Sequence, residues 1–564
     1  MGSIALPALG GLICVASPDS PGLRLLGGLL ILAAFGYQLA RFAVLARRGM
    51  VERFWIGAPT AGVLIVATGL WHVSNRPDQA FGIGASVLLL LVVAWWGRNL
   101  RAYTELEAPL VSRIPGVPER PGPVARGYRW WSTYLLATLV VAFVLGLVRA
   151  PALVLAAVIV GGVAAMSGVA VPILRSRATH LQITQALTDY APLVALPYAG
   201  RAIFHTAMWA PYVARTGEKY VIVASRHETF HRLAAHSSDP IVAPATTSAA
   251  DIETAMPRSL RVAFYVQNSV ENRDFLSLDR MTHVFVHHGD GDKPASAHGR
   301  SVGYDVLVVA GQAAIDRYAQ NDVEVPGERF KILGRPQTER IETVDHPISS
   351  VENPVVLYAP TWHGPNESQN YCSLEVGKSI VRALLDRELT VIFRRHPAGS
   401  DWPEHEGIIA DIKKMLAADS SRTGRPHLFG REAAVNLPLH EAINRCDAMV
   451  ADVSGIVTDY MASLKPFAMV AMKSGSAQEG GTATERFRRI YPTGRSAYVI
   501  EKDLSTLHEV LDSMLGPDPL AQIRAERRDY YLGGYENGES AQAFMEYVRG
   551  FARDDAHPRA GHDA

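Results

Sequence analysis

The first third of the chain is divided by arginines into long stretches that carry no Asp, Glu, Lys or Arg, and no other feature constrains the fold as strongly. The charge-free stretches are Leu25–Ala40, Phe54–Asn75, Gln79–Gly97, Trp130–Val148 and Ala150–Leu174. A helix of about 20 mainly apolar residues crosses a bilayer core about 30 Å thick. Four stretches reach that length, and the first reaches it if the flanking arginines extend to the interface. The sequence therefore predicts a transmembrane region of about five helices in residues 1–178.

Basic residues are concentrated in the loops that follow the first, third and fifth stretches. By the positive-inside rule these loops are cytoplasmic. We therefore expect a multi-pass protein of the inner (plasma) membrane, in contact with membrane lipids, whose catalytic part is cytoplasmic. The short apolar segment Ile4–Ala16 leaves a further span open. A buried helical domain is the alternative, but five consecutive core helices without a polar face argue against it.

Overall charge and cysteine content exclude several classes of protein. Lys and Arg total 55 and Asp and Glu total 55 among 564 residues, with no basic tail. This balance argues against a nucleic-acid binder, whose affinity depends on clustered positive charge. Cys14, Cys372 and Cys446 are too few and too scattered for a disulfide framework or a structural zinc site.

From Tyr220 onward, short β-branched runs alternate with helix-like segments, which is typical of buried parallel strands in an α/β fold. The predicted strands are 220–224, 261–266, 283–286, 305–309, 354–359, 389–393, 448–451 and 467–471. A polar stretch rich in Pro, Thr, Glu and Ser precedes Pro354 and is typical of a linker. The pattern predicts two doubly wound, Rossmann-like domains with a ligand cleft between the carboxyl ends of their strands.

The domain boundaries follow from these changes of pattern. They are 1–178 for the transmembrane region, 179–214 for a membrane-proximal helical connector, 215–335 for the N-terminal α/β domain, 336–353 for the linker, 354–550 for the C-terminal α/β domain and 551–564 for a disordered tail. Residues 180–200 interleave apolar and polar side chains. This part of the connector either lies along the membrane surface or forms the first helix of the soluble part.

Three polar clusters directly follow predicted strands, where open α/β sheets bind ligands. They are His287–Lys293, Arg394–His396 and Asp452–Asp459. Adjacent histidines suit a general base, arginines suit phosphate oxygens, and Ser with Gly at a helix start suits a phosphate group. Each cluster alone has a plain structural interpretation, as a turn, a charged strand end or a helix cap. Their common position at one predicted cleft favours a functional site.

Two other short patterns match known enzyme motifs. His227–His231 matches the zinc-protease pattern, but nothing singles out a third ligand. Gly299–Gly303 matches the nucleophile elbow of hydrolases, yet it precedes a predicted strand, whereas an elbow follows one. The sequence contains no Walker A or Gly-x-Gly-x-x-Gly pattern, which removes the usual ATPase and dinucleotide interpretations.

The chain resembles the CDP-glycerol glycerophosphotransferases, the teichoic-acid-type polymerases and primases of the bacterial cell envelope. The resemblance is carried by Leu357–Trp362, Arg394–Pro397, Asp452–Tyr460 and the pair His288-Gly289 with Lys293. It covers about residues 215–550. It implies a GT-B fold, with an acceptor domain followed by a nucleotide-donor domain. It also implies transfer of glycerol phosphate from CDP-glycerol to a hydroxyl of a lipid-linked glycan acceptor, with release of CMP and no required cofactor.

The resemblance assigns roles to individual residues. His288 would be the base that deprotonates the acceptor hydroxyl, and His396 is the second catalytic candidate. With Arg394, His396 would hold the diphosphate, and Ser454 with Gly455 would take the charge that develops on CMP. The remaining candidates are Arg395, Thr361, Asp452 and Asp459 on the donor side and Gly289, Lys293 and Asp290 on the acceptor side.

The chain differs from the usual family pattern at several positions. His287 stands where Trp is common, Asp290-Gly291 where Thr-Pro is common, Gly455 where Ser is common, and His363 where Arg or Lys is usual. CDP-ribitol or another activated group is therefore an open alternative donor, and Asp290 with Asp292 leaves a divalent cation open. Two further functions are alternatives: a GT-B glycosyltransferase that uses a nucleotide sugar, and a non-catalytic nucleotide- or glycan-binding scaffold of envelope assembly.

Overall fold

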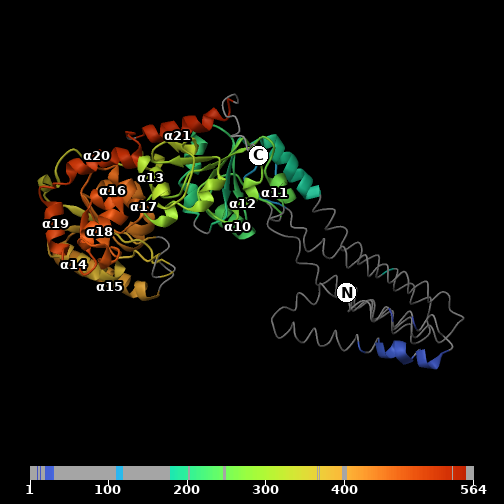
Figure 1. Cartoon of the computed structure of the whole chain (residues 1–564), viewed down its shortest axis with the longest axis horizontal. Helices are drawn as coiled ribbons and strands as arrows, with labels where there is room; N and C mark the ends of the chain where they lie inside the picture. The colour runs from blue at the N-terminus through green and yellow to red at the C-terminus, as the bar shows by residue number, and fades with distance from the viewer. Residues whose placement is uncertain are drawn as a thin grey trace. The chain divides into compact units, whose positions relative to one another are not determined.

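The computed structural model describes residues 9, 13, 20–23, 25–30, 33, 109–117, 160, 178–200, 203–245, 249–364, 366, 369–396, 403–536 and 538–553. The chain forms two compact units (Figure 1). The first unit comprises Met1–Asp189 with Val242–Ala255, and the second comprises Tyr190–Ile241 with Met256–Ala564. Both α/β halves belong to the second unit, so their mutual contacts can be described.

The transmembrane part of the predicted fold class is wrong. Across the described ranges, no helix has both the length and the apolar character needed to cross a membrane. Of the five stretches, Phe54–Asn75, Gln79–Gly97 and Trp130–Val148 lie outside the described residues, and only single positions or short pieces of the other two are described. The prediction counted charge-free length, whereas a span also requires one continuous apolar helix of about 20 residues. The predicted multi-pass localisation in the inner membrane depended on these spans. Without them, that prediction has no support and is also wrong.

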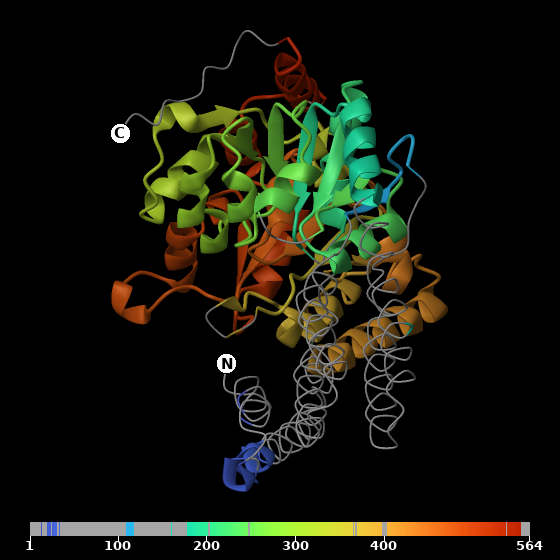
Figure 2. The same ribbon diagram turned by 90° about the vertical axis from the view of Figure 1, so that its right-hand side faces the viewer.

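The α/β part of the predicted fold is confirmed, beginning with a parallel sheet in the first half of the second unit (Figure 2). Its strands in this unit run in the order β3-β2-β5-β6-β7-β8, all parallel. Their bounds are β2 (Val194–Tyr198), β3 (Tyr220–Ala224), β5 (Val262–Tyr265), β6 (Thr282–Phe285), β7 (Val306–Val309) and β8 (Phe330–Ile332). The central strands are buried on both faces, which is why they are continuous apolar runs. Two more strands, β1 (Leu110–Ser112) and β4 (Ile241–Ala243), lie wholly or partly in the first unit.

The second half contains a five-stranded parallel sheet in the order β10-β9-β11-β12-β13. Its strands are β9 (Val355–Ala359), β10 (Thr390–Phe393), β11 (Ala448–Ala451), β12 (Phe467–Ala471) and β13 (Tyr498–Glu501). Alternate residues point to opposite faces, so that Val356 and Tyr358 join one hydrophobic core and Leu357 and Ala359 join the other. Two parallel sheets of this kind make up a GT-B-like fold.

Helices alternate with the strands along the chain, and the last two connect the halves of the second unit. In order, the α-helices are α8 (Phe204–Ala207), α9 (Ala210–Arg215), α10 (His227–His236), α11 (Ala249–Ala255), α12 (Asn272–Leu276), α13 (Gln312–Gln320), α14 (Leu374–Leu385), α15 (Pro403–Thr423), α16 (Leu439–Arg445), α17 (Gly455–Met461), α18 (Ala483–Ile490), α19 (Leu507–Leu515), α20 (Ala521–Leu532) and α21 (Glu539–Gly550). Helix α20 packs against α13 of the first half and α17 of the second, and α21 returns to α9 (Figure 1). The C-terminal helices therefore fasten the two halves together.

The predicted linker and the predicted connector both contain short helical segments. Residues 178–190 are helical and lead into β2, which is a central strand of the first sheet. Within the predicted linker, Pro336–Thr338 and Ile348–Ser350 form short 3-10 helices. In the predicted disordered tail, residues 554–564 lie outside the described residues.

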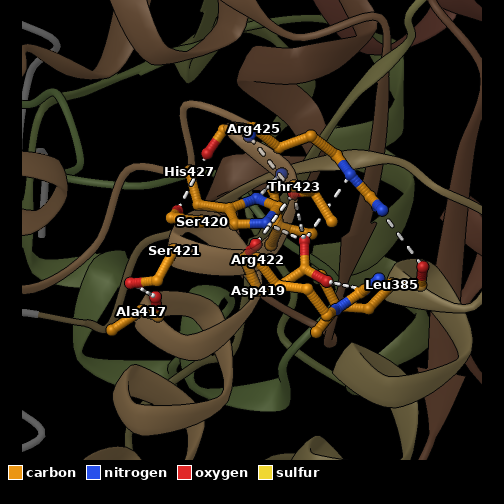
Figure 3. A network of polar contacts seen from close by, with 10 residues as sticks. Leu385, Ala417, Asp419, Ser420, Ser421, Arg422, Thr423, Arg425 and His427 are labelled. Atoms are coloured by element: carbon orange, nitrogen blue, oxygen red, sulfur yellow. Dashed lines mark hydrogen bonds and ion pairs between the residues drawn. The ribbon is translucent and has the colours of Figure 1, made fainter.

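A polar network fixes the end of α15 to strand β10 (Figure 3). The backbone N–H of Val391 donates to Nδ1 of His427 at 2.9 Å, so the ring proton is on Nε2, which donates to Asp419 at 3.0 Å. Arg422 and Arg425 also pair with Asp419. This network holds the neighbouring segment against β10, whose carboxyl end leads directly to the Arg394–His396 cluster.

Candidate active site

The three polar clusters predicted from the sequence meet where the two halves face each other. Nζ of Lys293, in the first half, lies 3.2 Å from Oγ1 of Thr361 in the second. A Cβ placed on Gly291 would lie 3.2 Å from the backbone nitrogen of Gly455, so the loop after β6 touches the start of α17. A side chain at Gly291 would be packed tightly against this backbone, so Gly291 permits the close approach of the halves here.

His288 has the hydrogen bonding of a general base. Its Nδ1 lies 3.1 Å from the carbonyl oxygen of Val266, and a carbonyl only accepts, so Nδ1 carries the proton and Nε2 carries the lone pair. Burial of the ring among protein groups lowers the pKa of His288, and the charge of Arg335 lowers it further. The side chain nevertheless remains accessible to solvent. His288 is therefore neutral at neutral pH and presents a basic nitrogen.

The ring of a second histidine, His205, packs against the ring of His288, and no sequence motif revealed it. The ring centroids of His205 and His288 are 4.2 Å apart, and Nδ1 of His205 lies 3.2 Å from the hydroxyl of Tyr198. Burial lowers the pKa of His205 to about 3, so its ring is neutral. His205 lies on α8, outside the boundaries predicted for the α/β domains, and no spacing pattern connects it to His288.

His287 points away from His288 because the backbone turns between them. His287 has a φ of 59°, in the left-handed region that non-glycine residues seldom adopt. Its carbonyl accepts a hydrogen bond from the indole of Trp209 at 2.7 Å, and its ring packs 4.1 Å from that of Phe285. Burial lowers the pKa of His287 to about 3. The turn at His287 thus directs only His288 toward the second half.

Lys293, Thr361 and Asp452 form a connected group behind the contact between the halves. Asp452 is fully buried, and its Oδ2 accepts the N–H of Thr361 at 2.7 Å and the N–H of Ser373 at 3.0 Å. Burial raises the pKa of Asp452 to about 6. Burial also lowers the pKa of Lys293, and the charge of Asp452 opposes that shift. Asp452 therefore orders the loop after β9, on which Thr361 faces Lys293.

His396 follows β10 and faces the same group. Burial lowers its pKa to about 4, and the nearby charges of Lys293 and His288 lower it further. His396 is consequently neutral in the free protein, and it lies near Lys293 and His288, because both influence its pKa. The structure thus brings His288, Lys293 and His396 together, as the sequence predicted for one site.

The two arginines beside His396 are held by the protein itself. Nη1 of Arg394 donates to the carbonyl oxygens of Ala433, within the π-helical turn Glu432–Asn436, and of Leu437, directly after it, at 2.6 Å. Arg395 pairs on the surface with Glu406 at 2.7 Å. Both arginines therefore stabilise contacts within the second half. Their role in donor binding stays a prediction.

Ser454 differs from these two arginines, because its hydroxyl makes no hydrogen bond among the described residues. It precedes α17 without capping it, and within the described residues its buried Oγ has no hydrogen-bond partner. Gly455 begins the helix and lies against the backbone of Gly289 and Asp290. Ser454 thus has an unused hydroxyl directly at the contact between the halves.

Three predicted site carboxylates are paired with arginines that the motifs did not include. Arg317 binds Asp290 and lies 3.6 Å from Asp292, whose other oxygen accepts the N–H and hydroxyl of Thr493 at 2.7 and 2.6 Å. Arg335 binds Asp459 at 2.7 Å, and all of these side chains are buried. The bonds to Thr493 and Asp459 join the halves, so these carboxylates hold the site together.

The two competing motifs have structural explanations. His227–His231 lies on α10, and within the described ranges the single group of three potential metal ligands lies elsewhere, at His363, Glu375 and His405. Gly299–Gly303 is a 3-10 helix that precedes β7, so it is not a nucleophile elbow.

Two parallel α/β halves whose strand ends meet at a neutral histidine, a lysine and a second histidine have an arrangement that suits a two-domain group-transfer enzyme. Residues 336–548 match the model of a family described as CDP-Glycerol:Poly(glycerophosphate) glycerophosphotransferase. The chain is therefore a CDP-glycerol glycerophosphotransferase-like enzyme, with the matched domain in its second half.

The solved structures that resemble this chain share little sequence with it. They include the wall teichoic acid polymerase TagF, at 10% identity over 68% of this chain and 96% of that chain, with a TM-score of 0.40. A UDP-N-acetylglucosamine 2-epimerase matches at 11% identity over 66% of this chain and 99% of that chain, with a TM-score of 0.39. MurG of Acinetobacter baumannii matches at 12% identity over 64% of this chain and 100% of that chain, with a TM-score of 0.39. A search of curated proteins finds no match.

Proposed function

We propose that this enzyme transfers glycerol phosphate from CDP-glycerol to a hydroxyl group of an acceptor and releases CMP. The observation that carries the proposal is the geometry of His288, whose Nδ1 is occupied by the carbonyl of Val266 and whose Nε2 is therefore basic. The family match of residues 336–548 supports CDP-glycerol as the donor.

The proposed step combines the transfer of one proton to His288 with the transfer of one glycerol phosphate group to the acceptor. Nε2 of His288 accepts the proton of the acceptor hydroxyl, and the acceptor oxygen attacks the phosphorus that bears the glycerol. The bond from that phosphorus to the bridging oxygen breaks, and the bridging oxygen leaves with its electron pair as part of CMP. Such a reaction depends mainly on positioning and on stabilisation of charge.

Lys293, His396 and Ser454 would provide that stabilisation. Lys293 lies at the contact between the halves, where a negative diphosphate would favour its charged form. His396 is neutral in the free protein, and the diphosphate would raise its pKa and favour a hydrogen bond from the ring. The buried hydroxyl of Ser454 is a further donor for the same phosphate oxygens.

For the acceptor we propose a terminal hydroxyl of a lipid-linked glycan or of a growing glycerophosphate chain on it. The description of the matched family supports this choice, because it names poly(glycerophosphate) beside CDP-glycerol. The test compares a lipid-linked glycerophosphate acceptor with free glycerol. Faster turnover with free glycerol would contradict the proposed acceptor.

The reaction itself is proposed to need no metal at Asp290 and Asp292. Arg317 pairs with both carboxylates, and Thr493 donates two hydrogen bonds to one oxygen of Asp292. Addition of Mg²⁺ to the dialysed enzyme should therefore leave the rate of CMP release unchanged. A strict requirement for Mg²⁺ would contradict this part of the proposal.

Nucleotide analysis of the products tests the proposed chemistry directly. Incubation with CDP-glycerol and acceptor should yield CMP, whereas a glycosyltransferase that uses a nucleotide sugar would release a nucleoside diphosphate. A scaffold protein would bind CDP-glycerol without turnover. His236→Ala, at an exposed position on α10, serves as the control for His288→Ala and should retain activity.

A further inference from the structure

A group of metal-ligating side chains lies in the second half, apart from the residues assigned to the reaction. The ligand atoms of His363, Glu375 and His405 all lie within 4.8 Å of one another. His363 belongs to the loop after β9, Glu375 to the first turn of α14 and His405 to the first turn of α15. The helices α14 and α15 pack side by side (Figure 1). Three separate segments therefore converge on one point.

The geometry of the two imidazoles suits a common tetrahedral ion. The ring centroids of His363 and His405 are 5.1 Å apart, with an angle of 64° between the planes. Two imidazoles bound to one zinc ion at about 2.0–2.1 Å with tetrahedral angles have centroids roughly 5 Å apart. The rings thus already have the separation that a shared ion requires, and Glu375 is exposed and can rotate toward it.

The tautomer of His363 is also the one that a metal ligand needs. Its Nδ1 lies 2.7 Å from the carbonyl oxygen of Gly364 and so carries the proton. Its Nε2 lies 2.9 Å from the side-chain amide nitrogen of Asn370, which donates to it, so Nε2 carries a lone pair. Metal-binding histidines commonly donate the opposite ring N–H to a backbone carbonyl in this way. The Nε2 of His363 would exchange the amide of Asn370 for the metal.

We propose that His363, Glu375 and His405 form a binding site for a divalent transition-metal ion such as Zn²⁺. Two imidazoles and one carboxylate are ligands that zinc and its neighbours accept, whereas Mg²⁺ and Ca²⁺ prefer sites made of oxygen atoms. Three protein ligands leave one position for water. The bound ion would fasten the loop after β9, which carries Thr361, to α14 and α15. Its role is to position that loop, not to take part in phosphoryl transfer.

Metal binding by the full chain without a histidine tag tests the proposal. Titration of the dialysed protein with ZnCl₂ in a calorimeter should give one tight site. His363→Gln and Glu375→Gln should each weaken Zn²⁺ binding by at least about tenfold. The matched controls His346→Ala and Glu352→Gln alter exposed residues outside the group and should bind as the unaltered protein does. Equal affinity in all five proteins, or no tight site in the unaltered protein, would overturn the proposal.

Cobalt gives a second measurement that does not depend on activity or on the buried residue His405. Co²⁺ in a four-coordinate site of this kind should produce strong visible absorption, and excess Zn²⁺ should remove it. Glu375→Gln changes an exposed side chain, so its far-UV circular dichroism should match that of the unaltered protein. A cobalt spectrum unchanged by both Glu375→Gln and His363→Gln would contradict the assigned ligands.

Discussion

Removal of the Asp459 carboxylate should destabilise the enzyme strongly, because it leaves a buried arginine without its counter-charge. Nε of Arg335 lies 2.7 Å from Oδ1 of Asp459, and Nη2 lies 3.5 Å from both Oδ2 of Asp459 and the carbonyl of His288. The two side chains are only 4% and 8% exposed. The pair therefore connects α17 of the second half to the turn that carries the proposed base.

The magnitude follows from burial. Burial by itself would lower the pKa of Arg335, but the charge of Asp459 and its hydrogen bond outweigh that effect and raise it. Breaking such a buried pair by removing one partner costs about 3–5 kcal/mol, whereas replacing both partners with apolar residues of similar volume is often nearly neutral. Asp459→Ala should thus lose about 3–5 kcal/mol of unfolding free energy, and Arg335→Met combined with Asp459→Leu should lose much less.

Urea unfolding followed by far-UV circular dichroism measures these changes. The control is Arg215→Ala, which breaks an ion pair with Glu339 in which the arginine is 46% exposed. Exposed pairs contribute about 0–1 kcal/mol, so this variant should unfold close to the unaltered protein. If Asp459→Ala costs no more than Arg215→Ala, or if the double replacement is as unstable as Asp459→Ala, the reasoning from buried charge is refuted.

Three further outcomes are expected. Because burial lowers the pKa of His288 from its ordinary value of 6.5, the base form persists to lower pH, and kcat/KM should decline only below pH 6.5; a decline centred above that value would contradict the assignment. Gly291→Ala, which places a Cβ 3.2 Å from the facing backbone nitrogen, should lower kcat/KM roughly tenfold or more, whereas Gly299→Ala, with open space around its Cβ, should leave it unchanged. His427→Ala removes the partner of both Val391 and Asp419 and should cost about 1–3 kcal/mol in urea unfolding; an unchanged midpoint would show that the network does not support β10.

The sequence was sufficient to predict several buried strands, including β9, β10 and β11, and the polar clusters that follow them, but it missed β2 and β13. Strands β9, β10 and β11 are continuous apolar runs, and their carboxyl ends meet because parallel strands in one sheet end at the same edge. Strand β2 escaped prediction because Pro197 interrupts its pattern, and proline is rare in central strands.

The partners of the charged site residues could not be predicted, because they depend on contacts between distant segments. Arg317 and Arg335 belong to no motif, yet they bind Asp290, Asp292 and Asp459. The charge-free stretches at the N-terminal end misled for a related reason. Absence of charge is a local property, whereas a membrane span requires a continuous apolar helix, which the described residues do not contain.

The central claim is that His288 acts as the base in transfer from CDP-glycerol, and CMP release by the purified enzyme measures it most directly. With CDP-glycerol and a lipid-linked glycerophosphate acceptor, the unaltered enzyme and His236→Ala should release CMP at equal rates. His288→Ala should lose activity by a factor of about 10²–10⁴ while still binding CDP-glycerol. Full CMP release by His288→Ala, or no CMP release by the unaltered enzyme from any CDP-alditol, would contradict the account.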